Sequence, residues 1–352
     1  MLPAILPLEM VLNGLLRSYI NMKLKEPNIS IINVNYNGKK FLKAFFSSLK
    51  KLDYQNFEVI FVDNASSDGS IEFVKRNYPK ARVIENKKNL GFALANNQGA
   101  KIARGKYLFF LNNDTKIHPE VVSKLVEKME KNPTIGICGG KILSYDGERY
   151  FHTGIGVDIF GYPVLGKKIF YIEGSALMIR KSLFEKLGGF DPLYFMFHED
   201  VDLCWRARLL GYKVVAIPDA IIYHFAGGSA GGGEMNNGKY KSSYLRRYYH
   251  ERNNVRTILK NYQIKTLLFI FPLYFLLNLL EIFIFLFTFK FKIILLYLKA
   301  YIWNLVNFGD TLKERRKIQR IRTISDLELM KNMYFRSGKI IAFLKVGIPE
   351  FK

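Results

Sequence analysis

Apolar and polar residues alternate along the N-terminal part of the chain with two different periods. Short apolar runs that end in polar turns predict buried strands over residues 28–35, 58–62, 81–85 and 106–111. Between them, residues 38–52, 71–77 and 92–103 carry apolar side chains at the spacing of an amphipathic helix. Because strand and helix alternate, the pattern predicts an α/β fold with a mainly parallel sheet and helices on both faces.

Polar side chains follow the most apolar of these runs. Asn112, Asn113 and Asp114 come directly after residues 106–111, at the carboxyl end of the predicted strand. In open α/β sheets, ligands bind in the crevice beyond these strand ends. Mg²⁺ prefers oxygen ligands and often shares them with substrate phosphates, so Asp114 with its amide neighbours fits a metal–diphosphate site. The alternative is a plain turn, since Asn and Asp satisfy turn backbone locally.

Residues 266–307 form an almost unbroken apolar stretch, in which Glu281, Lys290, Lys292 and Lys299 are the only charges. A helix needs about 20 apolar residues to cross a bilayer core. The stretch therefore predicts one span over 266–289, and leaves open a second span running to residue 308 or a helical hairpin in one leaflet. Burial inside a soluble protein is the rival interpretation, although a core helix of ordinary size is not apolar all round.

Charge supports the membrane prediction. The formal net charge is +23, and basic residues gather on both sides of the apolar stretch. Such clusters attract anionic headgroups, and an excess of Lys and Arg marks the cytoplasmic side, so we expect a cell-membrane protein whose α/β domain faces the cytoplasm. Nucleic-acid binding is the alternative for so basic a chain, but no nucleic-acid motif accompanies the charge. The cluster before the stretch comprises Lys239, Lys241, Arg246, Arg247, Arg252, Arg256, Lys260 and Lys265.

The cysteine content fits a reducing compartment. Cys138 and Cys204 are the only cysteines, and they form neither a zinc-binding spacing nor a disulfide framework. The first 21 residues resemble neither a good signal peptide nor a full span, and Met22 is a second candidate start.

Polar motifs follow one another in the order seen in one enzyme family. They occupy residues 34–37 (Val-Asn-Tyr-Asn), 62–70 (Val-Asp-Asn-Ala-Ser-Ser-Asp-Gly-Ser), 89–92 with 96–99, 111–114 and 198–203 (His-Glu-Asp-Val-Asp-Leu). Over roughly residues 28–230 the chain thereby resembles the family 2 glycosyltransferases, and within them the rhamnosyltransferase-like branch. The resemblance implies a GT-A fold, a nucleoside-diphosphate sugar donor, a divalent metal ion (Mg²⁺ or Mn²⁺) and inversion at the anomeric carbon.

The resemblance also implies donor-binding residues. Asp63 could accept a hydrogen bond from a pyrimidine ring N–H, or could simply cap the turn that follows it. Gly91 could let the backbone approach a nucleotide, or could only supply backbone freedom at a helix start. The predicted nucleotide-sugar site comprises Asn35, Asp63, Asn89, Gly91, Asn112, Asn113 and Asp114.

The metal motif departs from the family pattern. The first of its two acidic positions is Asn112, which leaves Asp114 as the only carboxylate of the triplet. Metal affinity would then depend more on the substrate diphosphate. Similar enzymes place a metal-ligating His near the position of His224, although a lone His beside aromatic residues is often only packed or hydrogen-bonded.

The catalytic candidates are Asp200 and Glu199. Inversion requires a base that takes the proton of the acceptor hydroxyl, and we expect Asp200 to be this base, with Glu199 tuning it. Both precede a predicted helix over 201–210, whose N-terminus would stabilise a carboxylate, but Asp200 could also be only its N-cap. Glu173 and Gly174 occupy a position where similar enzymes approach the acceptor, and a plain turn explains them almost as well.

These predictions divide the chain into five parts. An N-terminal extension (1–27) precedes the GT-A catalytic domain (28–235), a basic juxtamembrane linker (236–264), the membrane segment (265–308) and a basic cytoplasmic tail (309–352). The predicted function is transfer of a sugar from a nucleoside-diphosphate sugar to a lipid-linked or cell-surface glycan acceptor, and the branch resemblance suggests rhamnose as that sugar. The alternative is a catalytically silent nucleotide-sugar-binding scaffold in a glycan assembly complex, an idea motivated by Asn112.

Overall fold

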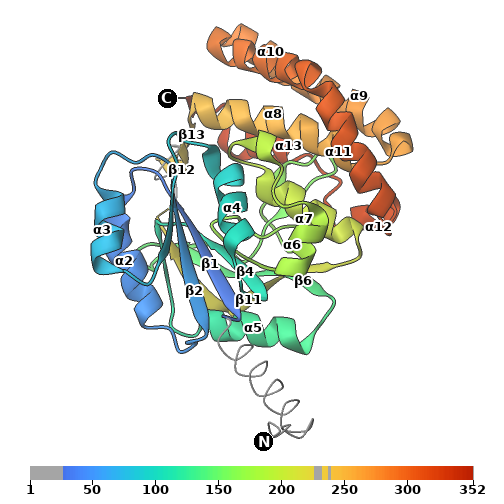
Figure 1. Cartoon of the computed structure of the whole chain (residues 1–352). Coiled ribbons are helices and arrows are strands. Elements are labelled where there is room, and N and C mark those ends of the chain that lie inside the picture. Colours follow the sequence, from blue (N-terminus) through green and yellow to red (C-terminus); the bar gives the residue numbers. More distant parts are fainter. Residues whose placement is uncertain (1–26, 226–231, 237–238, 352) are drawn as a thin grey trace, which may run out of the picture.

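The structure of the chain is a computed structural model that describes residues 27–225, 232–236 and 239–351 (Figure 1). The predicted N-terminal extension therefore lies almost wholly outside the described residues. The strands are β1 (Ile29–Asn35), β2 (Phe57–Asp63), β3 (Arg82–Glu85), β4 (Tyr107–Leu111), β5 (Thr115–Ile117), β6 (Ile135–Ser144), β7 (Tyr150–His152), β8 (Gly156–Val157), β9 (Pro163–Val164), β10 (Ala176–Arg180), β11 (Lys213–His224), β12 (Gly232–Asn236), β13 (Lys239–Ser242) and β14 (Glu350–Phe351). The helices are α2 (Lys39–Lys50), α3 (Ser70–Asn77), α4 (Gly91–Ile102), α5 (Val121–Lys131), α6 (Lys181–Leu187), the 3₁₀ turn η1 (Pro192–Tyr194), α7 (Glu199–Leu209), α8 (Tyr244–Asn261), α9 (Ile264–Phe287), α10 (Phe291–Val306), α11 (Phe308–Ile321), α12 (Asp326–Met330) and α13 (Gly338–Val346).

The central sheet has the strand order β3-β2-β1-β4-β10-β6-β11-β5, with β7 paired to β6. Strands β3, β2, β1 and β4 run parallel, as predicted. However, β10 is antiparallel to both of its neighbours, and β5 is antiparallel to β11. The sheet is therefore mixed: β6 and β11 are parallel, but the prediction of a mainly parallel sheet is wrong for the pairs that β10 and β5 form. The reason is that no crossover helix separates β6 from β10, and a parallel neighbour requires such a crossover.

Helices cover both faces of the sheet, as predicted (Figure 1). The side chains of β4 show why, because all five are buried and successive residues point to opposite faces. Leu108 and Phe110 pack in the core that includes α4, α6 and α7, whereas Tyr107, Phe109 and Leu111 pack in the core that includes α2, α3 and α5. A strand buried on both faces reads as a continuous apolar run, which is the pattern seen in the sequence.

Helix α8 is packed against the catalytic domain rather than forming a loose linker. Arg256 and Lys260 bond to Asp191 at 2.8 and 2.5 Å, and Lys260 also lies 3.1 Å from Asp202 of α7. Arg252 donates to the Leu193 carbonyl at 2.8 Å. The prediction that this basic segment faces lipid headgroups is therefore wrong for Arg252, Arg256 and Lys260, which are buried because they neutralise or cap groups of the domain.

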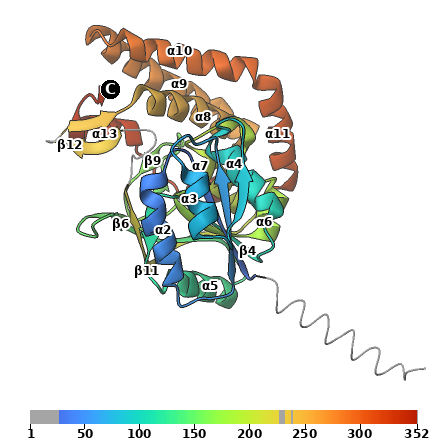
Figure 2. The ribbon, with the colours of Figure 1, turned by 60° about the vertical axis from the view of Figure 1, so that its left-hand side comes forward.

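Helices α8, α9 and α10 are stacked on one end of the domain (Figures 1 and 2). Among the described residues, α9 is the one unbroken helix that is long and apolar enough to cross a membrane, and only 17% of its most apolar window is buried; α10 and α11 pass the same test only as a pair bent by 66°. Exposed apolar side chains concentrate on α9, α10 and the turn between them, for example Phe269 (73% exposed), Phe287 (78%) and Phe289 (79%).

The inner side of α9 carries polar groups among its buried apolar side chains. Glu281 hydrogen-bonds to Tyr297 across the α9–α10 hairpin and pairs with Arg247 of α8. Lys339 of α13 also reaches Glu281, at 2.8 Å. The charge in the middle of the apolar stretch is thus explained by its position between the hairpin and the catalytic domain.

The C-terminal segment returns to the catalytic domain. Gly338 N–H donates to Asp158 at 2.6 Å across 180 residues of sequence, and Ile159 N–H donates to the Tyr334 carbonyl at 2.9 Å. Strand β14 pairs in parallel with β13. The segment predicted as a tail is therefore part of the packed structure over its described residues.

Candidate active site

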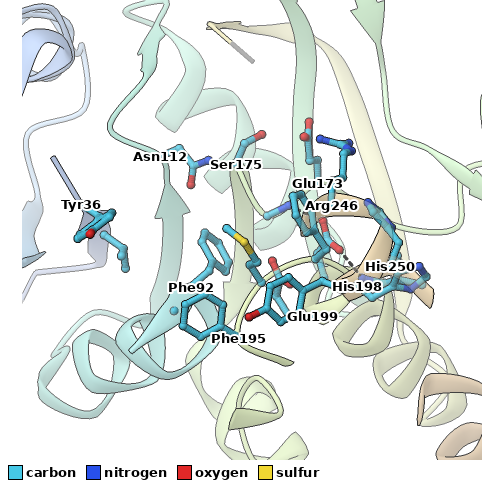
Figure 3. A pocket seen from close by; sticks show the side chains of 18 of the residues that line it. Tyr36, Phe92, Asn112, Glu173, Ser175, Phe195, His198, Glu199, Arg246 and His250 are labelled. Atoms are coloured by element: carbon cyan, nitrogen blue, oxygen red, sulfur yellow. Dashed lines mark hydrogen bonds between the residues drawn. The ribbon is translucent and has the colours of Figure 1, made fainter. Parts of the chain in front are cut away.

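A cavity of about 560 Å³ opens at the carboxyl ends of β1 and β4 (Figure 3). Its walls come from the N-terminus of α4, the turn after β4, the segment before β10, the loop that leads into α7, the end of β11 and one side of α8. Most of the residues predicted for the site line it: Asn89, Gly91, Asn112, Asn113, Asp114, Glu173, Gly174, Glu199, Asp200 and His224.

Two predicted donor residues do not line the cavity. Asn35 and Asp63 are fully buried at the ends of β1 and β2, and they hydrogen-bond to each other at 3.0 Å. Asp63 also accepts from Ser66 N–H at 2.8 Å, and Asn35 accepts from Asn113 at 2.6 Å. Their polar atoms are therefore used to hold three strand ends together, which is closer to the turn-capping alternative than to contact with a base.

Asp114 and His224 are brought together by strand pairing. Asp114 ends the turn after β4, and His224 pairs with Thr115 across the β11–β5 ladder. His224 Nε2 lies 3.3 Å from Asp114 Oδ1, an oxygen that is buried and forms no hydrogen bond within the described residues. Although burial lowers the pKa of His224, the carboxylates of Asp114 and Glu173 hold it above its usual value.

These two groups fit part of a metal site. An unsatisfied carboxylate oxygen beside a His nitrogen in a cavity is a donor set that Mg²⁺ or Mn²⁺ accepts. A cluster of three or more His, Cys, Asp or Glu ligands is absent from the described part of the chain, so substrate oxygens would have to complete the coordination. This agrees with the reduced charge expected from Asn112.

The candidate base lies in the first turn of α7. The helix begins at Glu199 with His198 as its N-cap, so Asp200 is not the N-cap that the alternative interpretation required. Gly174 N–H donates to Asp200 Oδ2 at 2.9 Å. Burial raises the pKa of Asp200 to about 6, and the charge of Glu173 acts in the same direction against the Gly174 N–H. A carboxylate with such a pKa is suited to accept a proton near neutral pH.

Glu199 and Glu173 have opposite electrostatic environments. Burial, together with the adjacent Asp200, raises the pKa of Glu199 well above its usual value. Burial also opposes ionisation of Glu173, but its hydrogen bond with His152, 3.0 Å long, and the charge of His224 lower its pKa to about 2. Glu173 is therefore a fixed negative charge beside Asp200, and Gly174 contributes a backbone donor to that residue.

The loop before α7 is strained. Phe195, Phe197 and His198 have φ of 47°, 66° and 67°, a region that non-glycine residues rarely adopt. Asn253 of α8 holds this loop, since its Nδ2 lies 3.0, 2.9 and 2.7 Å from the carbonyl oxygens of residues 194, 196 and 197. Phe92 N–H at the start of α4 donates to the Phe195 carbonyl at 2.5 Å. The sequence carried no signal for this arrangement beyond the position of the loop before the Glu-Asp pair.

Residues of α8 form the remaining wall, and sequence reasoning missed them. Arg246, Tyr249 and His250 line the cavity, together with His198. Figure 3 shows His198, His250 and Arg246 at one end of the pocket and Tyr36 at the other. The sequence marked Arg246 only as one member of a basic cluster.

Comparison with known proteins identifies what the chain is similar to. Residues 30–188 match the family model described as glycosyl transferase family 2. N-acetylglucosaminyl-diphospho-decaprenol L-rhamnosyltransferase of Mycobacterium tuberculosis is 25% identical over 254 residues, which covers 62% of this chain and 83% of the relative. Poly-beta-1,6-N-acetyl-D-glucosamine synthase of Staphylococcus epidermidis is 27% identical over 215 residues, covering 58% of this chain and 51% of the relative.

Solved structures share the fold. GalNAc-T7 with UDP, GalNAc and Mn²⁺ superposes with a TM-score of 0.54 at 18% identity, over 68% of this chain and 49% of that chain. S. aureus TarS 1-349 in complex with UDP gives a TM-score of 0.50 at 19% identity, over 66% of this chain and 64% of that chain. The chain thus spans less than two thirds of either solved chain, and the likeness is one of fold, a GT-A-like α/β architecture with a mixed sheet.

Proposed function

The chain is a family 2 glycosyltransferase, with its matching domain over residues 30–188, and on that basis we propose that it is a membrane-associated, inverting enzyme. It would move a sugar from a nucleoside-diphosphate sugar to a lipid-linked or cell-surface glycan acceptor. The observation that carries this proposal is the position of Asp200, whose carboxylate is held by Gly174 N–H in the same cavity as Asn112, Asn113 and Asp114. A base and a donor-binding turn in one cavity are what a single displacement needs.

The proposed chemistry is one in-line displacement. Asp200 takes the proton of the acceptor hydroxyl as the acceptor oxygen bonds to the anomeric carbon, and the bond from that carbon to the diphosphate oxygen breaks. The nucleoside diphosphate leaves, and no covalent intermediate with the protein forms. Glu173 stays ionised beside the base, and Glu199 supports it. Asn89, Gly91, Asn112 and Asn113 bind the nucleotide sugar, whereas Asn35 and Asp63 position the strand ends that carry this site.

Asp114 and His224 would hold the divalent cation, a role supported by the unbonded Asp114 oxygen beside the His224 nitrogen. Bound there, Mg²⁺ or Mn²⁺ supplies positive charge to the departing diphosphate.

A catalytically silent nucleotide-sugar-binding scaffold is the second candidate function. It is favoured by Asn112 and by the absence of a three-ligand cluster within the described residues. The environment of Asp200 favours the enzyme, because a scaffold has no need of a buried carboxylate with a pKa of about 6 facing the cavity.

Two features suggest the substrates. The relative from Mycobacterium tuberculosis is named as an L-rhamnosyltransferase acting on a diphospho-decaprenol-linked sugar. We therefore take dTDP-rhamnose as the first donor to test, with UDP- and GDP-sugars as the alternatives. An acceptor on a lipid carrier agrees with the apolar surface of α9 and α10.

We place the membrane contact on the α9–α10 hairpin. Exposed apolar side chains gather on this hairpin, and a contiguous exposed apolar surface on a protein marks an interaction site. The hairpin is fastened along α8 through Glu281 and Arg247, and α8 is itself packed on the domain. A helix fastened in this way cannot cross a bilayer without carrying α8 into it, so a hairpin in one leaflet fits better than two spans. The catalytic domain would then face the cytoplasm, where nucleotide sugars are available.

The test is donor binding and turnover of the detergent-purified protein with UDP-, GDP- and dTDP-sugars, each with Mn²⁺, Mg²⁺ or EDTA. The wild-type protein should bind one donor and transfer its sugar, and Asp200→Asn should bind that donor equally well but lose transfer. Donor binding without transfer by the wild-type protein would support the scaffold, and unchanged turnover of Asp200→Asn would remove the assignment of the base.

A further inference from the structure

Helix α8 separates the cavity from the apolar hairpin. One side of it carries Leu245, Arg246, Tyr249 and His250 into the cavity wall, which is the spacing of one helical face. The other side carries Arg247, which pairs with Glu281 of α9. Any ligand in this part of the cavity therefore lies one helix away from the apolar surface.

The guanidinium of Arg246 has no oxygen partner within the described residues. It lies over the ring of Phe197, 4.9 Å from the centroid, and the backbone N–H of the residue donates to Ser243 Oγ at 3.1 Å. The other arginines of α8 differ, since Arg247, Arg252 and Arg256 all donate to a carboxylate or a carbonyl. Glu173, Glu199 and Asp200 line the same cavity, but the Arg246 guanidinium forms no ion pair with them within the described residues, so this half-buried arginine is available to bind an anion there.

Two histidines lie beside Arg246. His198 is almost fully buried, and neither ring nitrogen has a hydrogen-bond partner in the described part of the chain. Its ring contacts that of His250 edge-on, with centroids 5.2 Å apart, and His250 stacks on Phe197 at 4.8 Å. Burial lowers the pKa values of both rings, His198 to about 4, and for His250 the charge of Arg246 adds to this. Both rings are therefore neutral at pH 7. Each can donate one N–H without repelling the neighbouring Arg246 guanidinium.

An apolar path leads from this group to the hairpin. Leu245 at the cavity wall is 47% exposed, and the neighbouring Tyr244 packs on the cluster of Phe285, Ile293 and Tyr297 at the end of α9 and the start of α10. The turn between these helices exposes Phe287 and Phe289. Along the N-terminal end of α8, the Arg246 guanidinium in the cavity is followed by the apolar rim at Leu245. The exposed apolar surface of the α9–α10 turn comes next.

We infer that Arg246 and His250 bind the phosphate of the acceptor, and that the acceptor is a glycan carried on a lipid phosphate or diphosphate whose chain passes over Leu245 towards the α9–α10 turn. This inference rests on the proposed function and names the acceptor class for the same site. Arginine binds phosphate oxygens through charge-assisted hydrogen bonds, and an apolar chain next to the phosphate would meet Leu245 rather than water.

The donor diphosphate is expected elsewhere in the cavity. Asp114 and His224 lie together at the end of β11, and Figure 3 shows Tyr36 and Asn112 well separated from His250. A phosphate at Arg246 is thus on the side of Phe197 and His198, the residues that lead into Glu199 and Asp200. This is the side on which the base must meet the acceptor hydroxyl.

The test compares a charged and an uncharged acceptor. The probes are N-acetylglucosamine linked to farnesyl diphosphate and the uncharged farnesyl N-acetylglucosaminide, and their Kd values are measured with the full-length protein in detergent without donor. The wild-type protein should prefer the diphosphate probe. In Arg246→Gln the Kd of the diphosphate probe should rise about 10- to 100-fold, the range expected for a lost hydrogen bond to a charged group, and that of the uncharged probe should not change. Arg246→Lys should recover part of the affinity.

Control measurements distinguish binding of the acceptor phosphate from binding of bilayer headgroups. Arg316→Gln removes an exposed charge from α11 outside the cavity and should not affect either probe. Flotation with phosphatidylglycerol vesicles should be equal for Arg246→Gln and wild type, because the site is not a bilayer headgroup site. The melting temperature of Arg246→Gln should stay near that of wild type, since the change removes the contact with the Phe197 ring but no ion pair within the described residues.

The outcomes distinguish this inference from the proposed function. A protein that transfers sugar but binds both probes equally overturns the phosphate site and leaves the enzyme intact. A rise of the donor Kd instead of the acceptor Kd in Arg246→Gln also overturns it, by assigning Arg246 to the donor. Loss of vesicle flotation in that variant, with acceptor binding unchanged, overturns it in favour of a headgroup site.

Discussion

Asn253 should control catalysis without touching the substrate. It lies on α8, is fully buried, and offers its amide to the carbonyl oxygens of residues 194, 196 and 197. The loop it holds contains three non-glycine residues at positive φ and leads directly into Glu199 and Asp200. Replacing Asn253 by Ala removes the amide and leaves the backbone of this loop to find other partners.

The energies of the backbone strain and of the lost hydrogen bonds predict how the loop responds. Each residue in such a conformation costs on the order of 1–3 kcal/mol, so the three together store roughly 3–9 kcal/mol. A buried carbonyl that loses its donor costs about 1–3 kcal/mol. With the amide gone, the three bonds that offset this strain are lost, and we expect the loop to relax and move Asp200. A displacement of about 1 Å at a reacting group can lower the rate roughly 100-fold.

The assay is steady-state transfer by Asn253→Ala, with the donor Kd and the melting temperature measured on the same protein. Asn254→Ala is the matched control, because Asn254 is the next residue of α8, is equally buried, and donates to the Phe160 carbonyl at 2.8 Å away from the base loop. Both variants should lose stability to a similar degree, but only Asn253→Ala should lose about 100-fold in kcat while it keeps its donor affinity. Equal kcat values for the two variants would refute the reasoning.

Further outcomes follow from the electrostatics and the surface. Turnover should fall about tenfold per pH unit below pH 6 and level off above it, since Asp200 acts as a base only when ionised, and a flat kcat profile from pH 5 to 8 would contradict its role. Glu173→Gln removes the neighbouring negative charge, so the acid limb of that profile should move to lower pH; a shift to higher pH would show that another group dominates. His224→Ala should raise the Mn²⁺ concentration that gives half-maximal turnover, measured by metal titration against His118→Ala on the surface, and no difference between the two would exclude His224 as a ligand. Replacing both Phe287 and Phe289 by Ser should weaken flotation with lipid vesicles roughly 100-fold or more, because each buried aromatic ring contributes about 1.5–3 kcal/mol, and undiminished flotation would place the membrane contact elsewhere.

The turn after β4 shows what the sequence was able to predict. A continuous apolar run must be a strand buried on both faces, and parallel strands deliver their polar ends to one edge, so the position of Asp114 in a cavity followed from pattern alone. The same reasoning does not account for the position of Asp63, which is buried away from the cavity wall, because a polar strand end can also bond to the neighbouring strand ends. Its bonds to Asn35 and Ser66 depend on tertiary register that no local pattern contains.

The residues of α8 show why the rest of the site was not predicted. Its cluster of basic residues resembles a solvated belt, yet Arg256 and Lys260 are buried against Asp191, and Arg246 faces the cavity. The surroundings of these basic side chains differ because they depend on which side of the helix meets the domain. That side is set by acidic partners far away in the chain. Helical periodicity identifies the sides of such a helix but not what covers each of them.

The contact between Gly338 and Asp158 has a consequence for the synthesis of this protein. The two residues are separated by 180 positions, and the strand pair β13–β14 forms only after residues 350–351 have been made. Residues 30–188 therefore emerge from the ribosome well before their final neighbours have been made. Contacts over such sequence separations also form slowly. During that interval the apolar side chains of α9 and α10 leave the ribosome ahead of α13, so nascent chains should depend on chaperones or on a nearby bilayer until α13 has emerged.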